Sequence, residues 1–470
     1  MSFPSFVGRR DEMASLDAEL DRVRESGAGR LVVVRGRRQV GKSRLLTEWL
    51  RHAQVPAAFF TASRRPSARE VELFAQEVAG SSLPSASSFA AARPGDWDDA
   101  LGLLAATHGP APTVVVIDEF PYLLGDDASI EATFQKLWDR RLNALPILLV
   151  LVGSDLAIME SLTSYDRPLY GRSNRELVVE PLGPDAVAEL LDLDAAAAID
   201  AHLVVGGFPG VLTSWPRGVT VREFVDAALA DPTSPLVVMG ERSLAAEFPP
   251  QTHPRRVLEV IGSGRRSFRA IADRAGVSDA SLSQALALLA SKRVVAVEDP
   301  LSTKPSRRLR RYRVADPYLR FWLRFVGPRL EDIARGRPEL ATRPLWAGWT
   351  AYRGLAVEPL IRDAIARLLP DGRFGDAQRV GSWWNRAHDT EIDLVGVPDP
   401  PDRIGFVGAV KWRDRGTFDD ADARELSTAA AGLSGVDGNT LHVGVSRAGF
   451  ATTRLDVTLG PDDLIHPLPG

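Results

Sequence analysis

Five short runs of mainly apolar residues recur in the first 180 positions of this 470-residue chain. The segments between them have the spacing of apolar side chains that is typical of amphipathic helices. Strands that alternate with helices in this way form a parallel sheet with right-handed crossovers. We therefore expect residues 1–180 to fold as one α/β domain. Its strands are expected at residues 31–35, 57–61, 113–117, 147–152 and 176–180.

Beyond residue 180 the pattern predicts three further domains. Residues 181–250 have helical spacing, with a sharp turn at residues 206–209, and are expected to form a helical lid. Residues 251–315 are typical of a winged helix–turn–helix: helix, turn, helix, and then two short strands around a basic loop. Residues 316–470 begin with helices and continue with four strand-like segments, which predicts a second α/β domain. The small core of the winged helix is expected to contain Ile271, Ala275, Leu282, Leu286 and Leu289.

Residues 36–43 read GRRQVGKS, which matches G-x-x-x-x-G-K-[ST], the phosphate-binding P-loop. The match lies between an apolar strand and the amphipathic stretch RLLTEWLRHA, where the backbone N–H groups of the loop and the first helical turn can bind phosphate oxygens. The alternative is a glycine-rich turn that binds no ligand. The residues expected to surround the nucleotide are Gly36, Arg37, Arg38, Gln39, Val40, Gly41, Lys42, Ser43 and Arg44.

The side chains of this loop predict ATP and Mg²⁺ as its ligands. Gly36 and Gly41 permit the tight path of the backbone. Lys42 would place its charge near the β- and γ-phosphates, and Ser43 would ligate Mg²⁺.

A second apolar run, TVVVIDE at residues 113–119, ends in two carboxylates and is typical of a Walker B strand. Asp118 would hold the Mg²⁺ ion or its water, and Glu119 would orient the attacking water. Nucleotide binding needs the first acid alone, whereas hydrolysis also needs the second. The alternative is a strand that ends in a solvated acidic turn.

Composition narrows the class of protein. Cysteine is absent, which excludes a disulfide framework and a thiolate metal site and fits a cytoplasmic location. The longest apolar run, residues 147–152, is too short to cross a bilayer, so we expect no membrane segment. Apolar and charged fractions of 45% and 25% are ordinary for a globular chain.

Charge is distributed unevenly along the chain. The net charge is −4, yet residues 253–329 hold 17 Lys and Arg against 6 Asp and Glu, a local charge of +11. A basic helix–turn–helix predicts contacts with the phosphate backbone of DNA. The alternative is a regulatory module that packs within its own protein. The residues that would carry DNA contacts are Arg265, Arg266, Arg269, Lys304, Arg307, Arg308, Arg310 and Arg311.

Eight segments in a fixed order resemble one known family. They are FVGRRDEM, GRRQVGKS, VVVIDEF, LVLVGSDLAIM, PLYGRS, VVGGFPGVL, ADPYLRFWLRF and EIDLV…VKW. The chain is similar, over essentially its whole length, to the archaeal-type P-loop ATPases of prokaryotes, an AAA+-related and STAND-like group. Many members carry a winged helix and a C-terminal restriction-endonuclease-like domain.

The resemblance implies roles for two further residues. Ser154 would end the sensor strand and bond to the γ-phosphate or the attacking water. Arg172, in LYGRS, would be the basic residue that follows this strand and acts on phosphate in cis or in trans. The alternatives are a plain strand end and a solvated arginine.

The resemblance also implies a metal-dependent nuclease site in the last domain, which the sequence leaves incomplete. Glu358 matches the helix acid, Asp393 the first strand acid and Lys411 the lysine of the next strand. The second acid is replaced by Ala409, which cannot ligate a metal, and Asp414 is too far along the chain to substitute easily. We expect a nuclease fold without robust cleavage, because a Mg²⁺ site that lacks one carboxylate binds weakly. The alternative is an ordinary pair between Asp393 and Lys411.

Together these features predict a cytoplasmic, ATP-binding and Mg²⁺-dependent ATPase that acts as a molecular switch, in association with DNA through the winged helix. One alternative is a STAND-type signalling ATPase that makes no DNA contact, and another is an ATP-regulated DNA nuclease. Self-association is left open.

Overall fold

The computed structural model describes residues 6–125, 129–304, 309–387 and 389–465. The chain divides into two compact units, Met1–Pro181 and Leu182–Gly470. The finer division of the second unit into three domains stays a prediction. Among the described residues, no helix is both long and apolar enough to span a membrane.

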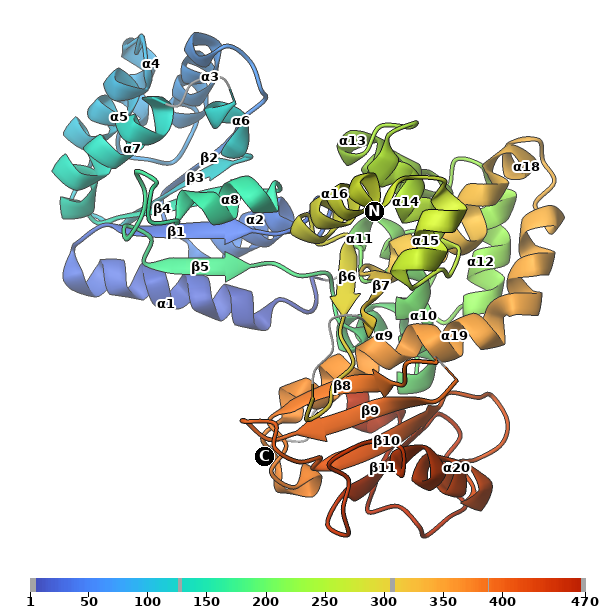
Figure 1. The fold of residues 1–470 in the computed structure, drawn as a ribbon. Coiled ribbons are helices and arrows are strands. Elements are labelled where there is room, and N and C mark those ends of the chain that lie inside the picture. The colour runs from blue at the N-terminus through green and yellow to red at the C-terminus, as the bar shows by residue number, and fades with distance from the viewer. Residues whose placement is uncertain (1–5, 126–128, 305–308, 388, 466–470) are drawn as a thin grey trace. The chain divides into compact units, whose positions relative to one another are not determined.

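The first unit is built on a five-stranded parallel sheet (Figure 1). Each strand expected from the apolar runs is present, and the strand order is β2-β3-β4-β1-β5. Because β4 lies between β1 and β3, the loops that follow these three strands meet at one edge of the sheet. The strands are β1 (Arg30–Arg35), β2 (Ala57–Thr61), β3 (Thr113–Asp118), β4 (Ile147–Gly153) and β5 (Arg175–Val178).

Helices cover both faces of this sheet. Leu31 and Val33 of β1 pack into a core with Phe74, Trp97 and Phe134, which lie on α3, α5 and α7. Helix α1 packs against β1 and β4. The helices are α1 (Arg10–Ser26), α2 (Lys42–Ala53), α3 (Ser67–Ala79), α4 (Ala86–Ala91), α5 (Trp97–Ala106), α6 (Pro121–Leu124), α7 (Ser129–Arg140) and α8 (Leu156–Leu162).

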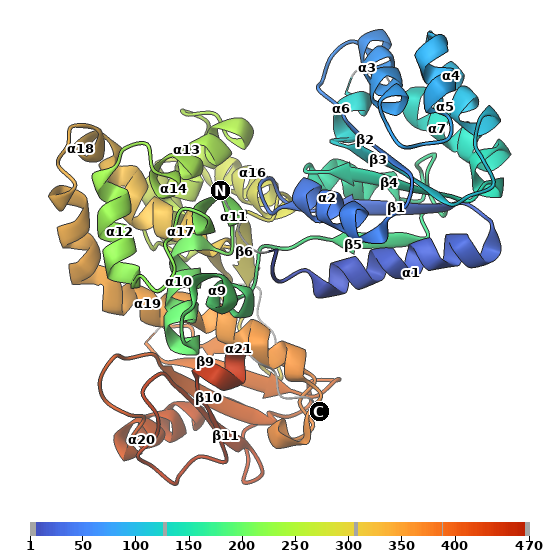
Figure 2. The same cartoon turned by 180° about the vertical axis from the view of Figure 1, so that it is seen from behind.

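The second unit begins with a helical region (Figure 2). Its sharp turn lies where the sequence predicts it, after α10, and both Gly206 and Gly207 have positive φ angles of 60° and 72°. Gly207 also packs directly against Leu182, whose N–H donates to the Gly207 carbonyl at 3.0 Å. The helices are α9 (Pro184–Leu191), α10 (Ala195–Val205), α11 (Pro209–Leu212), α12 (Val221–Ala230) and α13 (Pro235–Glu247).

Three helices and a two-stranded antiparallel sheet follow, in the order expected for a winged helix. A left-handed Gly276 ends α15, and Ser278 caps α16 by accepting a hydrogen bond from the Ser281 N–H. All five expected core residues are buried. The elements are α14 (His253–Gly262), α15 (Phe268–Ala275), α16 (Asp279–Ser291), β6 (Val295–Glu298) and β7 (Arg311–Val314).

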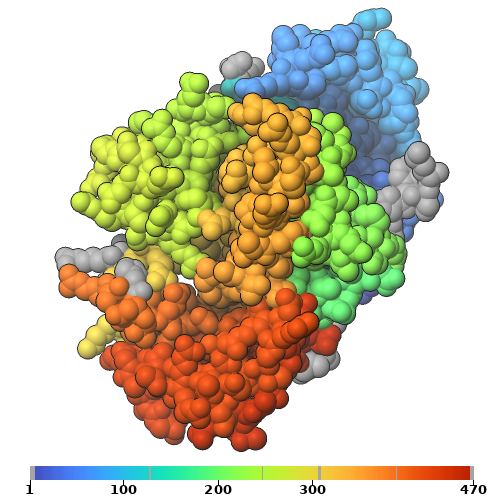
Figure 3. Space-filling view, turned by 90° about the vertical axis from the view of Figure 1, so that its right-hand side faces the viewer, coloured from blue at the N-terminus to red at the C-terminus, as the bar shows by residue number. Residues whose placement is uncertain are grey.

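The chain then continues through α17 (Pro317–Phe321), a π-helical turn at Trp322–Val326, a 3-10 turn at Gly327–Arg329 and α18 (Leu330–Ala334). The long helix α19 (Glu339–Leu368) follows. It begins 11 residues before the helical stretch read from the sequence at residue 350. The sequence conceals this start, because Pro344 lies inside the helix and proline usually ends or kinks one. In Figure 3 its orange atoms form a band between the green helical region and the yellow-green segment of α14 to α16.

A separate mixed sheet completes the second unit, with the order β12-β11-β10-β9-β8. Strands β8, β9 and β10 are antiparallel, whereas β10, β11 and β12 are parallel. Helix α20 crosses over between β10 and β11. The elements are β8 (Arg379–Trp384), β9 (Glu391–Val397), β10 (Phe406–Lys411), α20 (Asp420–Ala430), β11 (Leu441–Ser446), β12 (Val457–Leu459) and α21 (Pro461–Ile465).

A buried ionic cluster ties the helical region to this sheet. Asp200 of α10 accepts hydrogen bonds from Arg353 of α19 at 2.9 Å and from the Trp412 indole at 2.9 Å. Arg447 lies 3.1 Å from the same carboxylate, and Arg353 also binds Asp414 at 2.7 Å. Burial raises the pKa of Asp200, although both arginines oppose that effect. Asp414, which the sequence places too far along the chain to replace the missing nuclease acid easily, is thus engaged by Arg353.

We predict that Gly207→Ala destabilises the protein much more than Gly218→Ala. Both glycines have a φ of 72°, so each alanine bears the cost of a left-handed residue, about 1–2 kcal/mol. A Cβ on Gly207 would overlap the Leu182 carbonyl, whereas nothing lies within 4 Å of one on Gly218. The overlap should add about 1–3 kcal/mol to the loss of unfolding free energy. Thermal or urea unfolding of the two variants measures the difference, and equal losses would contradict this account of the turn.

Candidate active site

The carboxyl ends of β1, β4 and β3 bring together the residues that the motifs predict. The P-loop follows β1, Ser154 follows β4, Asp118 ends β3 and Glu119 follows it. Ligands of open α/β sheets bind in the crevice outside the carboxyl ends of the strands. The strand order thus places phosphate-binding and carboxylate groups at the expected edge.

The P-loop has the tight backbone that its glycines allow. Gly41, with a φ of 96°, stands before α2, and Gln39 also has a positive φ of 67°. Lys42 folds back over the loop and donates to the carbonyls of Gly36 at 2.9 Å and Arg37 at 3.1 Å. Burial lowers the pKa of Lys42, and the charges of Glu119 and Asp118 oppose this shift.

Arg9 supports the loop from outside. Its guanidinium is buried, donates to the Val40 carbonyl at 2.9 Å and forms a 2.8 Å ion pair with Glu12. Neither residue was predicted from the sequence as part of the site. The signal that could have found them is the segment FVGRRDEM, which precedes the P-loop.

Ser43 and Asp118 form the position expected for Mg²⁺. The Ser43 hydroxyl donates to Asp118 Oδ2 at 2.5 Å, and the Glu119 N–H donates to Oδ1 at 2.9 Å. Asp118 is buried, and burial raises its pKa above the ordinary value. Two adjacent hard oxygens, one on a carboxylate that lacks solvation, suit a small divalent cation whose other ligands are phosphate oxygens and water.

Glu119 is held by the residue that follows the neighbouring strand. The Ser154 hydroxyl donates to Glu119 Oε2 at 2.8 Å. The backbone of Glu119 has a φ of 53°, a left-handed conformation that costs energy in a residue other than glycine and is concentrated at functional sites. The pair predicted to act on water is therefore preformed, with the glutamate oriented by the serine.

Three more of the residues predicted to surround the nucleotide contact the protein itself. Val40 is buried, Arg38 donates to the Tyr122 hydroxyl at 2.6 Å, and Arg44 lies 3.9 Å from Glu48 of its own helix.

The structure does not bring Arg172 to the other predicted residues. Its Nε and Nη2 donate to the carboxylate of Asp139 on α7 at 2.8–3.1 Å, and its Nη1 donates to the Tyr170 carbonyl at 2.8 Å. A guanidinium bound by two hydrogen bonds to one carboxylate is in a strong, oriented pair. A role for Arg172 at phosphate stays a prediction.

The predicted nuclease-type residues lie on neighbouring elements of the second unit: Glu358 on α19, Asp393 on β9 and Lys411 on β10. Asp393 accepts a hydrogen bond from the Val410 N–H at 2.8 Å, and Glu358 lies 3.5 Å from Arg362. Burial raises the pKa of both carboxyl groups, and the charge of Asp393 adds to the shift at Glu358.

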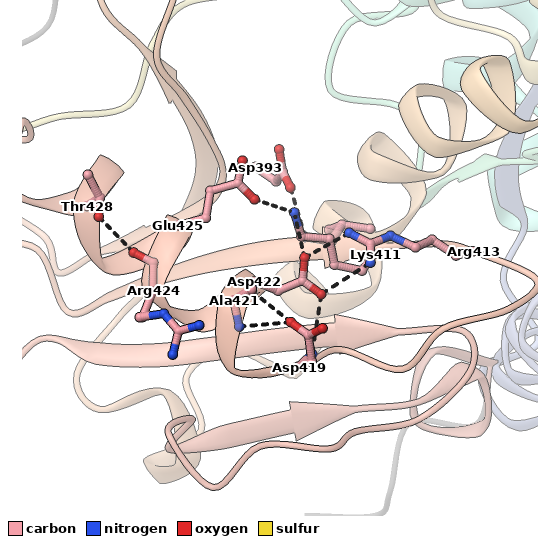
Figure 4. Close-up of polar contacts among 10 residues, drawn as sticks. Asp393, Lys411, Arg413, Asp419, Ala421, Asp422, Arg424, Glu425 and Thr428 are labelled. Carbon is pink, nitrogen blue, oxygen red and sulfur yellow. Dashed lines mark hydrogen bonds and ion pairs between the residues drawn. The ribbon is translucent and has the colours of Figure 1, made fainter.

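Lys411 is engaged by acids that were not predicted (Figure 4). Its ammonium donates to Glu425 at 2.8 Å and lies 3.3 Å from Asp422, both on α20. Asp422 also pairs with Arg413 at 2.8 Å and completes a capping box with Asp419. The sequence signal that could have predicted Asp422 as a partner of Lys411 is the acidic first turn of α20. Among the described residues, no cluster of three or more metal-ligating His, Asp or Glu side chains is present.

The basic residues of the α14–β7 segment divide into engaged and exposed groups. Arg311 is buried, pairs with Glu391 of β9 at 2.8 Å and lies 4.2 Å from the centre of the Trp384 ring. Arg310 pairs with Asp299 at 3.0 Å. Arg307 and Arg308 lie outside the described residues. Arg265, Arg269 and Lys304 are exposed, with Arg269 3.8 Å from the exposed Asp273, and Arg266 is half-buried.

The wing of this segment is attached to the C-terminal sheet. The Leu301 N–H donates to the Ser382 carbonyl at 2.8 Å, and the Trp384 indole donates to the Leu309 carbonyl at 2.8 Å. Arg311 therefore acts in an intramolecular contact, which removes it from the residues that can bind DNA. Helix α16 contains no Lys or Arg, and its outward positions include Ala280, Ala287 and Leu288.

Comparison with known proteins finds one family in each of the two units of the chain. The AAA ATPase domain matches residues 5–151, and a family described as archaea bacterial proteins of unknown function matches residues 322–426. The first unit has the fold of a P-loop ATPase. An uncharacterised protein of Methanocaldococcus jannaschii is 23% identical over 425 residues, which are 90% of each chain.

The chain is also similar to solved structures. The Walker-type ATPase of Pyrococcus abyssi has a TM-score of 0.50 and 21% identity, and the match covers 67% of this chain and 95% of that one. The Aeropyrum pernix ORC2 protein, solved in ADPNP–ADP complexes, has a TM-score of 0.46 and 17% identity, with 71% and 95% covered.

We predict that the C-terminal domain does not cleave DNA. The ammonium of Lys411 occupies the space between Asp422 and Glu425, and Ala409 supplies no carboxylate, so too few oxygens remain for tight Mg²⁺ binding. Supercoiled plasmid should stay intact with the protein, ATP and Mg²⁺ or Mn²⁺. The Asp393→Ala variant is the control for contaminating nuclease. Cleavage by the wild type that this variant lacks would show an active site and contradict the prediction.

Proposed function

We propose that this chain is a Mg²⁺-dependent ATPase that acts as a molecular switch. The observation that carries the proposal is the pair of hydrogen bonds at the sheet edge, from Ser43 to Asp118 and from Ser154 to Glu119. They join three loops that are distant in sequence into one constellation beside Lys42. The match of residues 5–151 to the AAA ATPase domain supports the same reading.

Each residue then has a distinct task. The backbone of the P-loop and Lys42 bind the phosphates, and Ser43 and Asp118 hold Mg²⁺, which would neutralise charge on the β- and γ-phosphates. Glu119 orients the attacking water, and Ser154 keeps its carboxylate in place. The left-handed backbone of Glu119 holds the carboxylate beside the Ser154 hydroxyl.

The switch would act on the second unit, and we propose that it does so on DNA. Exposed arginines at Arg265 and Arg269 support contact with phosphates. The burial of Arg311 and the absence of Lys and Arg from α16 favour the alternative, a signalling ATPase without DNA contact. A restriction-endonuclease-like origin of the C-terminal sheet fits the placement of Glu358 and Asp393. A cytoplasmic location and self-association stay predictions from the sequence.

The ATPase proposal predicts different effects for two substitutions. Lys42→Ala should abolish nucleotide binding, because the phosphates lose their buried cation. Glu119→Gln should keep binding but lower kcat by about 10²–10⁴-fold, since it loses the carboxylate that acts on water. Phosphate release and the binding of fluorescent ATP measure the two effects. Glu77→Gln, an exposed change on α3, is the matched control. Wild-type turnover by Glu119→Gln would refute the assignment.

The DNA proposal predicts salt-dependent, largely sequence-independent binding to duplex DNA. Arg265→Glu with Arg269→Glu should weaken binding and reduce the slope of log K against log salt by about 2, one unit for each lost phosphate contact. Arg217→Glu with Arg335→Glu, two exposed arginines elsewhere in the second unit, is the control with the same change in charge. Gel shifts or fluorescence anisotropy at several salt concentrations measure the slope. If the wild type does not bind at low salt, the signalling alternative stands.

A further inference from the structure

Arg38 of the P-loop is attached to the other side of the site. Its Nη2 donates to the hydroxyl of Tyr122 at 2.6 Å, and its guanidinium lies 5.9 Å from the centre of the Tyr122 ring. Tyr122 stands on α6, three residues after Glu119. The bond therefore connects the phosphate-binding loop to the segment that carries the catalytic carboxylates.

The position of this bond follows from the strand order. Strands β1 and β3 are not neighbours, because β4 separates them. A contact between the loop after β1 and the helix after β3 must therefore pass over the end of β4, where Ser154 binds Glu119. In P-loop enzymes the loop lysine contacts the β- and γ-phosphates and the Walker B acid holds the metal beside them, and the Arg38–Tyr122 bond joins the two segments that carry these groups.

The electrostatics of the loop favour an anion at this place. Arg38 is exposed, and its charge contributes to the lowered pKa of Lys42, although burial of Lys42 is the larger cause. Two cations thus act on each other from one short loop. An anion between them would relieve this repulsion and would be bound by both.

The partner of Arg38 is a weak competitor for phosphate. A phenol is a neutral acceptor, whereas a phosphate oxygen is charged, attracts the guanidinium as an ion and can take part in a bidentate pair with it. Arg172 differs in this respect, because it is bound by the carboxylate of Asp139 through two nitrogens. Exchange of a hydroxyl for a phosphate costs Arg38 little, whereas Arg172 would have to leave an ion pair.

We propose that Arg38 leaves Tyr122 and binds the terminal phosphate of ATP, so that the chain supplies this arginine to its own site and distinguishes ATP from ADP. Tyr122 is the neutral partner that the guanidinium gives up in exchange for the γ-phosphate. The inference rests on the proposed ATP site and deepens it.

The test compares the dissociation constants of fluorescent ATP and ADP for the full chain with Mg²⁺. Arg38→Ala should raise the Kd of ATP by about 10–100-fold, the worth of a charge-assisted hydrogen bond of roughly 1.5–3 kcal/mol, and leave that of ADP within about threefold. Arg38→Lys should lie between, because lysine keeps the charge but not the planar fork. Arg51→Ala, an exposed arginine at the end of α2, is the control and should change neither constant.

Tyr122→Phe separates the phosphate contact from a purely structural bond. It keeps the ring but removes the acceptor, so Arg38 no longer has to leave a partner, and the Kd of ATP should stay the same or fall. A rise equal to that of Arg38→Ala would show that the bond itself matters and would overturn the inference.

Three other outcomes are decisive. Equal weakening of ATP and ADP by Arg38→Ala would mean a general role in loop structure, and unchanged ATP binding would mean no contact. Either would overturn the inference and leave the ATPase proposal standing, provided that the wild type binds both nucleotides and Lys42→Ala binds neither. Failure of the wild type to bind nucleotide would overturn the proposed function itself.

Discussion

The strand order of the first unit is the constraint on which its site depends. Strand β4 lies between the strand that leads into the P-loop and the strand that ends at Asp118, and all three are parallel. Their following loops therefore meet at one edge, where Ser43 reaches Asp118 and Ser154 reaches Glu119. A different order would leave every motif intact in the sequence and yet separate these pairs. The motif residues can therefore act together only because the strand order of the sheet brings them to the same edge.

The cations of the P-loop differ from several cations of the second unit. In the second unit Lys411, Arg311 and Arg353 are each bound by carboxylates of other elements, so their charges are already paired within the fold. In the P-loop Lys42 donates to backbone carbonyls and Arg38 to a phenol, which are neutral acceptors. Removing one partner from a buried ion pair is costly, whereas a neutral acceptor gives way readily to an anion. This contrast distinguishes cations that stabilise the structure from cations that can bind phosphate.

The same contrast explains what could be predicted from the sequence. The parallel sheet and the P-loop are visible because a strand, a loop and a helix follow one another within about twenty positions, and local patterns record such units. The partners of Lys411 were missed because α20 meets β10 only in the folded sheet, and Glu391 reaches Arg311 across 80 positions. Strand β12 has three residues, too few for a recognisable alternation, and Pro344 concealed the start of α19. Net charge likewise counts residues without showing which of them are already paired.

The basic segment therefore has to be judged by its remaining surface rather than by its local charge of +11. Sequence readout in a helix–turn–helix needs side chains on the second helix that donate to base edges. The outward positions of α16 include Ala280, Ala287 and Leu288, which cannot donate, Asp279, which repels phosphate, and Ser283 and Gln284, which can donate. Arg265 and Arg269 lie just before and at the start of α15, and Arg256 and Arg274 are exposed as well. Such arginines can bind the phosphate backbone, so any affinity for DNA that they supply should fall steeply as the salt concentration rises.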